Sequence, residues 1–294
     1  WPELWEDWHA QLMKHNQAFD LGITLSDHQT FRAVFESAVA SDRLQNELIA
    51  LASFSHQVGG VHLDVEVKVE QTSRAAISRF RRFVQTLATR LHRLKPRRQL
   101  SIFLPSGTYA HLYDTKALRT IDWVVLQGYD AHFLDSPRAG PVAPLAGTDA
   151  VSWEKMLQLA DSMKLPHNRL LMGFPLYGYE WTVPSCQPRG VHQGIGGLTS
   201  LLPLKAMPNA SFRGDIQSQV ARHGAQVETE STSLYYLFDN GQGSCTVGWF
   251  EDSWSLKIKA DWLKQNGLAG LAFFPLGYDQ GVLTRILRDH WPRP

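Results

Sequence analysis

Three ionisable side chains alternate with apolar ones between Val61 and Glu66, where the chain reads Val-His-Leu-Asp-Val-Glu. In a β-strand, successive side chains point to opposite faces, so His62, Asp64 and Glu66 share one face and the apolar residues the other. Burial and like charge together raise the pKa of one of two neighbouring carboxyl groups. The segment therefore predicts a proton donor, and Glu66, at the carboxyl end of the strand, is the natural candidate.

Two other interpretations of this segment stay open. The three side chains could form a buried polar network that only stabilises the fold, since ionisable groups inside a protein must satisfy one another. They could also hold a metal ion if His62, Asp64 and Glu66 converged on one point.

The elements that would position these residues alternate between strand and helix along the chain. Strands are predicted where large apolar and β-branched residues gather, at about Phe19 to Ser26, Gly60 to Glu66, Gln99 to Pro105, Trp123 to Tyr129, Arg169 to Phe174 and Leu268 to Phe274. This alternation is typical of the α/β class and of a TIM (β/α)8-type barrel. A closed barrel needs about eight strands, and six are predicted. Either the sequence begins inside the barrel, or the barrel is incomplete, or another chain or domain supplies the missing strands.

Helices are predicted between these strands, most clearly at about Ser73 to Leu94, where apolar residues recur at helical spacing and Pro96 ends the pattern. The opposite face of this helix carries arginines and no acidic residue. Both a solvated outer face and an anion-binding surface are open for it. One helical segment, about Glu3 to His15, precedes the first strand.

The stretch from about Tyr179 to Gly248 breaks the alternation and is rich in Gly, Pro and Ser. We interpret residues 179–248 as an insertion between the last two strands of a barrel domain made of residues 1–178 and 249–294. Since the loops that follow barrel strands form the active face, the insertion is expected to build one wall of a cleft.

The charge balance excludes some partners. Lys and Arg number 29 and Asp and Glu 28, so no global field attracts nucleic acid or an acidic membrane. No apolar run reaches the roughly 18 residues of a membrane span. The chain starts at Trp1 rather than Met, so we expect a cleaved or omitted upstream segment that could include an export signal. The two cysteines, Cys186 and Cys245, could form one bridge or remain free thiols.

Several segments together resemble one known family. Gly59–Glu66 resembles the Asp-x-x-Asp-x-Asp-x-Glu signature of the glycoside hydrolase family 18 chitinases, which ends in their acid Glu. Further similar segments follow in the family's order: Gln127-Gly128-Tyr129-Asp130, Gly173–Trp181, Trp249-Phe250-Glu251-Asp252 and Gly270–Gly277. The last three look most like the branch with bacterial cell-wall and spore-cortex N-acetylglucosaminidases.

This resemblance implies hydrolysis of β-linked N-acetylglucosamine glycans (peptidoglycan, chitin or a related exopolysaccharide) outside the cell or in its envelope, without a cofactor. The substrate's own acetamido group would act as the nucleophile, with retention at the anomeric carbon. Glu66 would protonate the leaving oxygen, and Asp64 would orient the acetamido group. Tyr129 would donate a hydrogen bond to the acetamido oxygen, and Asp130 would support the sugar or the acid. The expected substrate-binding residues are His62, Gln127, Tyr177, Trp181 and Phe274.

The chain also departs from the family pattern. Gly59 and His62 stand where the family has its first two Asp residues, and the second of these normally shares a proton with the residue at the position of Asp64. Gln127 replaces the usual Met, and Phe274 stands where many members have Trp. The family's first two strands have no counterpart, so another domain or chain could complete the barrel. These departures keep a second hypothesis open, a catalytically impaired glycan-binding lectin or scaffold.

Other aromatic residues give weaker signals. Trp181, Trp249 and Trp254 could line a glycan cleft, although packing explains most tryptophans in a chain that has 10 of them. His132 follows Tyr129 and Asp130 closely and could border the cleft or lie in a surface loop.

Overall fold

The structure is a computed structural model. It describes residues 10–15, 17–191, 197–200, 216–275, 278–279, 283 and 285–286 of the 294. The chain forms two compact units, the first made of residues 1–125 and 163–169 and the second of residues 126–162 and 170–294.

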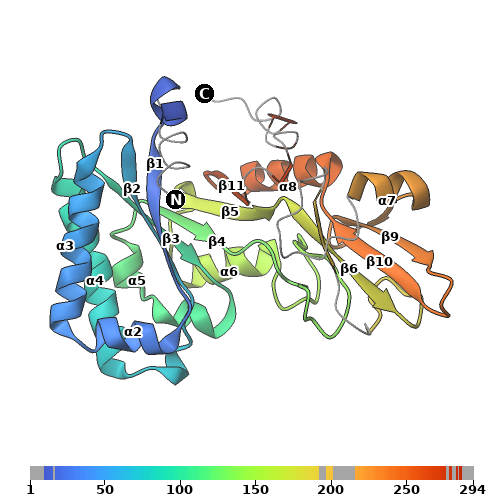
Figure 1. Cartoon of the computed structure of the whole chain (residues 1–294), viewed down its shortest axis with the longest axis horizontal. Coiled ribbons are helices and arrows are strands. Elements are labelled where there is room, and N and C mark those ends of the chain that lie inside the picture. Colours follow the sequence, from blue (N-terminus) through green and yellow to red (C-terminus); the bar gives the residue numbers. More distant parts are fainter. Residues whose placement is uncertain are drawn as a thin grey trace. The chain divides into compact units, whose positions relative to one another are not determined.

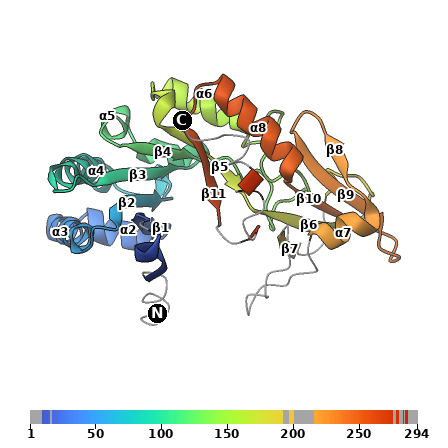
Figure 2. The same ribbon diagram turned by 90° about the horizontal axis from the view of Figure 1, so that it is seen from above.

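The first unit is a sheet of strands in the order β1-β2-β3-β4, with the β1–β2 and β2–β3 pairs parallel. Its elements in chain order are β1 (Phe19–Leu25), α2 (His28–Phe35), α3 (Ala38–Phe54), β2 (Val58–Val65), the 3-10 helix η1 (Val69–Gln71), α4 (Arg74–Arg93), β3 (Gln99–Leu104), the 3-10 helix η2 (Gly107–Leu112), α5 (Thr115–Leu118), β4 (Trp123–Leu126) and the 3-10 helix η3 (His167–Arg169). Helices α2, α3 and α4 contact one another and lie on the same side of β1, β2 and β3 (Figures 1 and 2).

Helix α4 confirms the clearest helix prediction. The side chain of Ser73 accepts a hydrogen bond from the backbone N–H of Ala76 and caps the first turn. The apolar stripe of α4 is buried, and its Phe80 ring lies 5.5 Å from that of Phe31 and 5.1 Å from that of Phe35, both on α2. These rings form part of the core between the helices.

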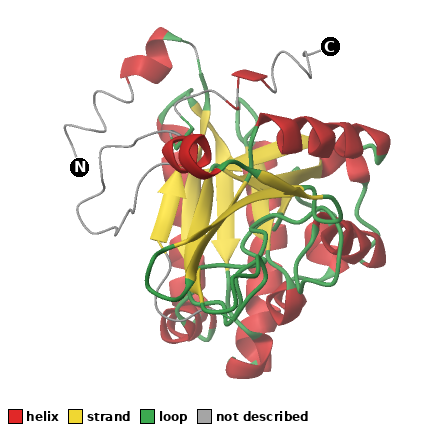
Figure 3. Ribbon diagram, turned by 90° about the vertical axis from the view of Figure 1, so that its right-hand side faces the viewer, coloured by secondary structure: helices red, strands yellow, loops and turns green. Residues whose placement is uncertain are grey.

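The second unit contains two kinds of sheet. Its elements are α6 (Trp153–Ser162), β5 (Leu170–Pro175), β6 (Tyr177–Val183), β7 (Gly197–Ser200), α7 (Ile216–His223), β8 (Gln226–Glu228), β9 (Ser233–Asp239), β10 (Cys245–Phe250), α8 (Ser253–Gln265) and β11 (Gly270–Phe274). Strands β5 and β11 pair in parallel, whereas β7-β6-β10-β9-β8 form an antiparallel sheet. Residues 127–152 contain no helix or strand beyond an isolated bridge at Arg138. Loops and turns are drawn green in Figure 3.

All six predicted strands are present, as β1, β2, β3, β4, β5 and β11. Strand β4 ends at Leu126, before the predicted end at Tyr129, and Asp130 then adopts a left-handed backbone with a φ of 58°. Of the helix predicted at Glu3 to His15, residues 10–14 are helical, and the part before residue 10 lies outside the described residues. The described residues before Phe19 contain no strand, as expected for an incomplete barrel.

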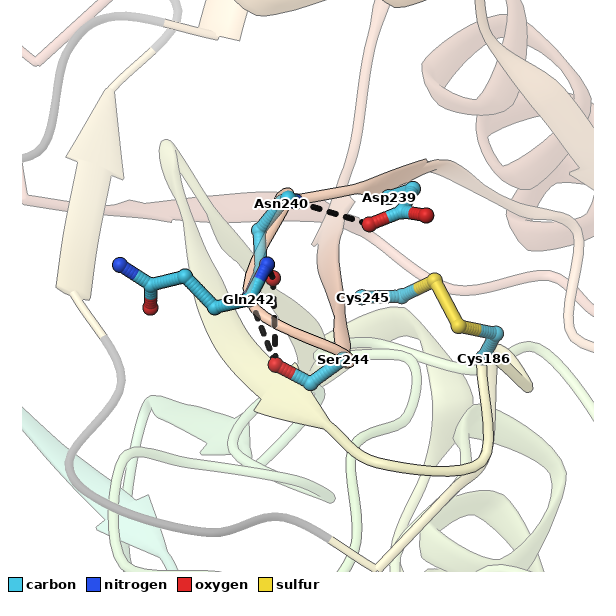
Figure 4. The surroundings of a disulfide bond; sticks show 7 residues. Cys186, Asp239, Asn240, Gln242, Ser244 and Cys245 are labelled. Atoms are coloured by element: carbon cyan, nitrogen blue, oxygen red, sulfur yellow. Dashed lines mark hydrogen bonds between the residues drawn. A yellow bond between two sulfur atoms is a disulfide. The ribbon is translucent and has the colours of Figure 1, made fainter.

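The antiparallel sheet spans most of residues 179–248, the segment interpreted as an insertion. The two compact units divide the chain at other points, so the insertion stays a prediction. At one end of this sheet, Cys186 and Cys245 form a disulfide across 59 residues. Figure 4 shows this bridge beside the turn between β9 and β10, where the backbone N–H of Gln242 donates to the side chain of Asn240.

A buried ion pair ties helix α8 to the rest of the second unit. The Lys259 ammonium donates to Glu251 Oε2 at 2.5 Å and to the backbone oxygen of Ala143 at 2.7 Å. Both charged side chains are at most 1% exposed. Burial raises the pKa of Glu251 and lowers that of Lys259, because each charge has lost its water. The pair is therefore stable only while both partners remain.

Removing one partner tests this dependence. We expect Glu251→Gln to lower the free energy of unfolding by about 3–5 kcal/mol, because it leaves the Lys259 charge buried without a carboxylate. Urea unfolding followed by fluorescence measures the change. The control is Lys264→Gln on the same helix, since its exposed pair with Asp261, at 3.7 Å, should contribute less than about 1 kcal/mol. Equal effects of the two substitutions would contradict the role given to the buried pair.

Candidate active site

The predicted alternation along strand β2 is confirmed. Val61, Leu63 and Val65 are at most 2% exposed, whereas His62, Asp64 and Glu66 on the opposite face are half-buried. Glu66 directly follows the strand, and its backbone N–H donates to Leu25 of β1 at 2.9 Å. The pairing with β1 thus extends past Asp64 and holds the backbone of Glu66 at the carboxyl end of the sheet.

Asp64 has one satisfied and one unsatisfied carboxylate oxygen. The Thr24 hydroxyl, on the neighbouring strand β1, donates to Oδ2 at 3.4 Å. The other oxygen, Oδ1, is buried and has no hydrogen-bond partner within the described part of the chain. Burial raises the pKa of Asp64 and the bond from Thr24 opposes this effect. A buried acceptor of this kind favours a ligand that can donate a hydrogen bond.

His62 bonds to β3 and not to Asp64. Its Nδ1 lies 2.9 Å from the Ser101 hydroxyl oxygen, within hydrogen-bonding distance. Burial lowers the pKa of His62, so the imidazole is favoured in its neutral form. The proton-sharing pair of acids that the family has at these two positions is therefore replaced by two separate contacts.

The alternative that this segment holds a metal ion is not supported by the arrangement of its side chains. No group of three or more His, Cys, Asp or Glu side chains in the described ranges is arranged to hold a metal ion. His62, Asp64 and Glu66 are therefore not a converging ligand set.

In the second unit, Asp130 is held by two tyrosines of strand β6. The Tyr177 hydroxyl donates to Asp130 Oδ1 at 2.6 Å, and the Tyr179 hydroxyl donates to the same oxygen at 3.3 Å. Burial raises the pKa of Asp130, and the two phenol bonds oppose this rise. Tyr179 was missed by sequence reasoning. Its spacing of two from Tyr177, which places both on one face of a strand, was the available signal.

Aromatic rings surround Tyr129. The Phe274 ring stacks on it at 5.7 Å with an interplanar angle of 10°, and the Tyr177 ring meets it edge-on at 6.4 Å. Gly173 allows this arrangement, because a Cβ there would lie 2.7 Å from the Tyr129 ring. Phe274 is 52% exposed and so offers an aromatic surface at the end of β11.

Gln127, Trp181 and Trp254 are further candidate binding residues of this unit. The Gln127 side-chain amide donates to the backbone oxygen of Tyr129 at 3.3 Å. Trp181 is 1% exposed and packs with Trp249 in the core of the antiparallel sheet, so in this structure its ring presents no surface to a ligand. Trp254 on α8 is 39% exposed.

His132 belongs to a polar network that the sequence did not reveal. Its Nε2 lies 2.9 Å from Asp149 Oδ1, and its Nδ1 lies 3.0 Å from the backbone oxygen of Arg138. Arg189 donates to Asp149 at 2.8 Å and forms an ion pair with Glu228. The charged side chains of this network, Asp149, Arg189 and Glu228, are 17 to 96 positions from His132, so no local pattern indicated them.

Comparisons with known proteins identify the fold and the family of the chain. The chain has the fold of the chitinase from Chromobacterium violaceum, with a TM-score of 0.73 and 22% identity over 97% of this chain and 83% of that one. The fold class is therefore the expected TIM (β/α)8 type. A family model described as "Glycosyl hydrolases family 18" matches residues 10–279, and the chain belongs to that family.

Two further relatives bear on function. The "Cortical fragment-lytic enzyme" of Bacillus anthracis is 26% identical over 285 residues, which are 92% of this chain and 59% of that protein. The chain thus spans less than two thirds of the length of this curated relative. A chitinase-like agglutinin from Robinia pseudoacacia has the same fold, with a TM-score of 0.73 and 19% identity over 92% of this chain and 81% of that one.

The Asp130 contacts can be tested in the folded protein. We expect Tyr177→Phe to raise the pKa of Asp130 further, because it removes the shorter hydrogen bond to the charged form. NMR titration of the Asp130 carboxyl carbon, assigned with Asp130→Asn, measures the change. Tyr179→Phe is the matched control and should raise this pKa less, since its bond is longer. An unchanged pKa in Tyr177→Phe would exclude the proposed contact.

Proposed function

We propose that this chain is a glycoside hydrolase that cleaves β-linked N-acetylglucosamine-containing glycans by substrate-assisted retaining catalysis. The observation that carries the proposal is the buried Oδ1 of Asp64, which has no hydrogen-bond partner among the described residues. The candidate acid Glu66, two residues on, directly follows β2. The N–H of a 2-acetamido group is the kind of donor that such an oxygen lacks. Membership of glycoside hydrolase family 18 supports the proposal.

Glu66 supplies the proton in the proposed reaction. Its carboxylic acid protonates the glycosidic oxygen as the bond from that oxygen to the anomeric carbon breaks. The carbonyl oxygen of the substrate's acetamido group attacks the anomeric carbon from the other face, and a cyclic oxazolinium ion forms. Water then opens this ion after losing a proton to the Glu66 carboxylate, so the anomeric configuration is retained.

Asp64 stabilises the charge that forms on the acetamido group. Its pKa is raised by burial before substrate binds, but a cation beside the carboxyl group favours the ionised form. The attraction between Asp64 and the acetamido group therefore grows as the oxazolinium ion develops. An interaction that is stronger in the transition state than in the ground state accelerates the reaction.

The remaining predicted residues support the sugar. Tyr129 donates a hydrogen bond to the acetamido oxygen, and Asp130, held by Tyr177, orients the sugar or the acid. The exposed face of Phe274 offers an apolar surface to a pyranose ring. His62, Gln127 and Trp181 complete the proposed site, with His62 acting through Ser101 and Trp181 acting by packing.

A location outside the cell or in its envelope fits this function. The disulfide between Cys186 and Cys245 favours an oxidising compartment. None of the helices in the described ranges is long and apolar enough to cross a membrane. The proposed partner is an N-acetylated polysaccharide or oligosaccharide.

A second candidate is a glycan-binding protein without turnover. The replacement of the family's Asp by His62 favours it, because the proton-sharing pair with Asp64 is lost. The fold shared with an agglutinin shows that this architecture also occurs in a protein named for binding. Turnover distinguishes the two candidates.

Glu66→Gln tests the proton donor. We expect it to lower kcat on N-acetylglucosamine oligosaccharides by about 100- to 10,000-fold, because an amide cannot protonate the leaving oxygen. Reducing-end assays measure the rate. Glu70→Gln, an exposed acid in η1, is the control and should retain wild-type activity. If the wild type and Glu66→Gln both bind these oligosaccharides and cleave none, the lectin candidate replaces the hydrolase.

Asp64→Asn tests transition-state stabilisation separately. We expect kcat to fall by about 100-fold or more with KM nearly unchanged, since the carboxylate acts mainly on a charge that forms during the reaction. Steady-state kinetics on the same oligosaccharides give both constants. A rise in KM at constant kcat would assign Asp64 to substrate binding alone.

A further inference from the structure

Helix α4 concentrates positive charge that no acid on the helix balances. It carries six arginines and no acidic residue. The neighbouring helices differ, because Arg32 on α2 pairs with Glu36, and Arg43 on α3 pairs with Glu47, each four residues on. An ordinary solvated helix face mixes both signs in this way. The face of α4 is thus an exception within the same unit, in a protein whose net charge is only +1.

Part of this face lines a groove of about 640 Å³ in the first unit. The groove is lined by α4, by Val69 of η1 and by the segment from η2 to α5. Its ionisable lining consists of Arg74, Arg81, Arg82, His111, Asp114 and Lys116. Four permanent positive charges therefore face one negative charge.

Most of these cations are available to a ligand. Arg81 donates to the backbone oxygens of His111 and Leu112 and lies 3.7 Å from Asp114, so its position is fixed. Arg74, Arg82 and Lys116 are exposed and have no hydrogen-bond or ion-pair partner among the residues that the structure describes. Guanidinium groups recognise carboxylates through paired hydrogen bonds, which suits an anionic ligand.

The groove adjoins the segments that follow the candidate catalytic strand. Val69, which lines it, comes three residues after Glu66, so their Cα atoms are at most about 11 Å apart. His111 and Lys116 follow the carboxyl end of β3, the parallel neighbour of β2. Because parallel strands end at the same edge of a sheet, the groove and Glu66 lie on the same side of the first unit.

We propose that this groove binds the carboxylates of an acidic N-acetylated glycan, so that the substrate is a charged polymer and not a neutral one. The inference rests on the proposed function and narrows its substrate class. The cations hold anionic substituents of a chain whose cleaved bond lies at Glu66. The attraction is between exposed charges, so salt weakens it.

Two soluble polymers of N-acetylglucosamine separate charge from sugar recognition: carboxymethyl chitin, which is anionic, and glycol chitin, which is neutral. We expect the wild-type chain to bind the anionic polymer about tenfold more tightly at about 0.02 M salt, and about equally at about 0.5 M salt. Isothermal titration calorimetry measures both affinities. We expect the double variant Arg82→Ala/Lys116→Ala to lose the preference while keeping its affinity for glycol chitin.

Arg93→Ala is the matched control, because Arg93 is an exposed arginine of the same helix outside the groove. It should retain the wild-type preference, and circular dichroism should show all variants folded. Equal losses in Arg93→Ala and in the double variant would overturn the groove in favour of a diffuse field. The absence of any preference in the wild type would also overturn it.

Hydrolysis of the two polymers, measured separately, tests the function itself. A wild-type chain that cleaves glycol chitin but shows no charge preference retains the proposed function and rejects the groove. A chain that shows the preference and cleaves neither polymer retains the groove as a binding site for acidic glycans and rejects the hydrolase.

Discussion

The burial of ionisable side chains on one face of β2 is the constraint on which the candidate site depends. Val61, Leu63 and Val65 must lie in the core, and the pleat of the strand then forces His62, Asp64 and Glu66 to the opposite face. Desolvation makes each of these groups unfavourable as an ion unless a partner compensates. The strands on either side supply partial compensation, Thr24 from β1 and Ser101 from β3. One oxygen of Asp64 remains without compensation.

The two half-buried aspartates among the candidate residues, Asp64 in the first unit and Asp130 in the second, differ in their hydrogen bonds. Asp130 receives two phenol hydrogen bonds on one oxygen, which stabilise its charged form against burial. Asp64 receives one longer bond, from Thr24 at 3.4 Å, and burial raises the pKa of both acids. The buried Oδ1 of Asp64, which has no hydrogen-bond partner in the described part of the chain, therefore gains more from a ligand that donates a hydrogen bond than Oδ1 of Asp130 does.

Local patterns in the sequence were sufficient for strands β1 to β5 and β11 and for helix α4, but not for the antiparallel sheet or for the contacts. The alternation in β2, the apolar stripe of α4 and its ending before Pro96 are short-range features, and the structure confirms them. Thr24 contacts Asp64, and Ser101 contacts His62, each from about 40 positions away, through the register of a parallel sheet. The register of two strands depends on both strands and on the segment that connects them, so a pattern within one strand does not reveal it. The disulfide stayed undecided for the same reason, since 59 residues separate its cysteines.

The exchange of an acid for His62 changes what controls the charge on Asp64. Two carboxyl groups that share a proton titrate as a pair, and the charge on one depends on the proton held by the other. Here burial favours a neutral imidazole that bonds to Ser101, so His62 does not take part in that exchange. The charge on Asp64 is then governed by its burial, by Thr24 and by the substrate. In the proposed reaction, the cation that forms on the bound acetamido group favours the ionised form of Asp64, so the charge of the acid is linked to the progress of the reaction.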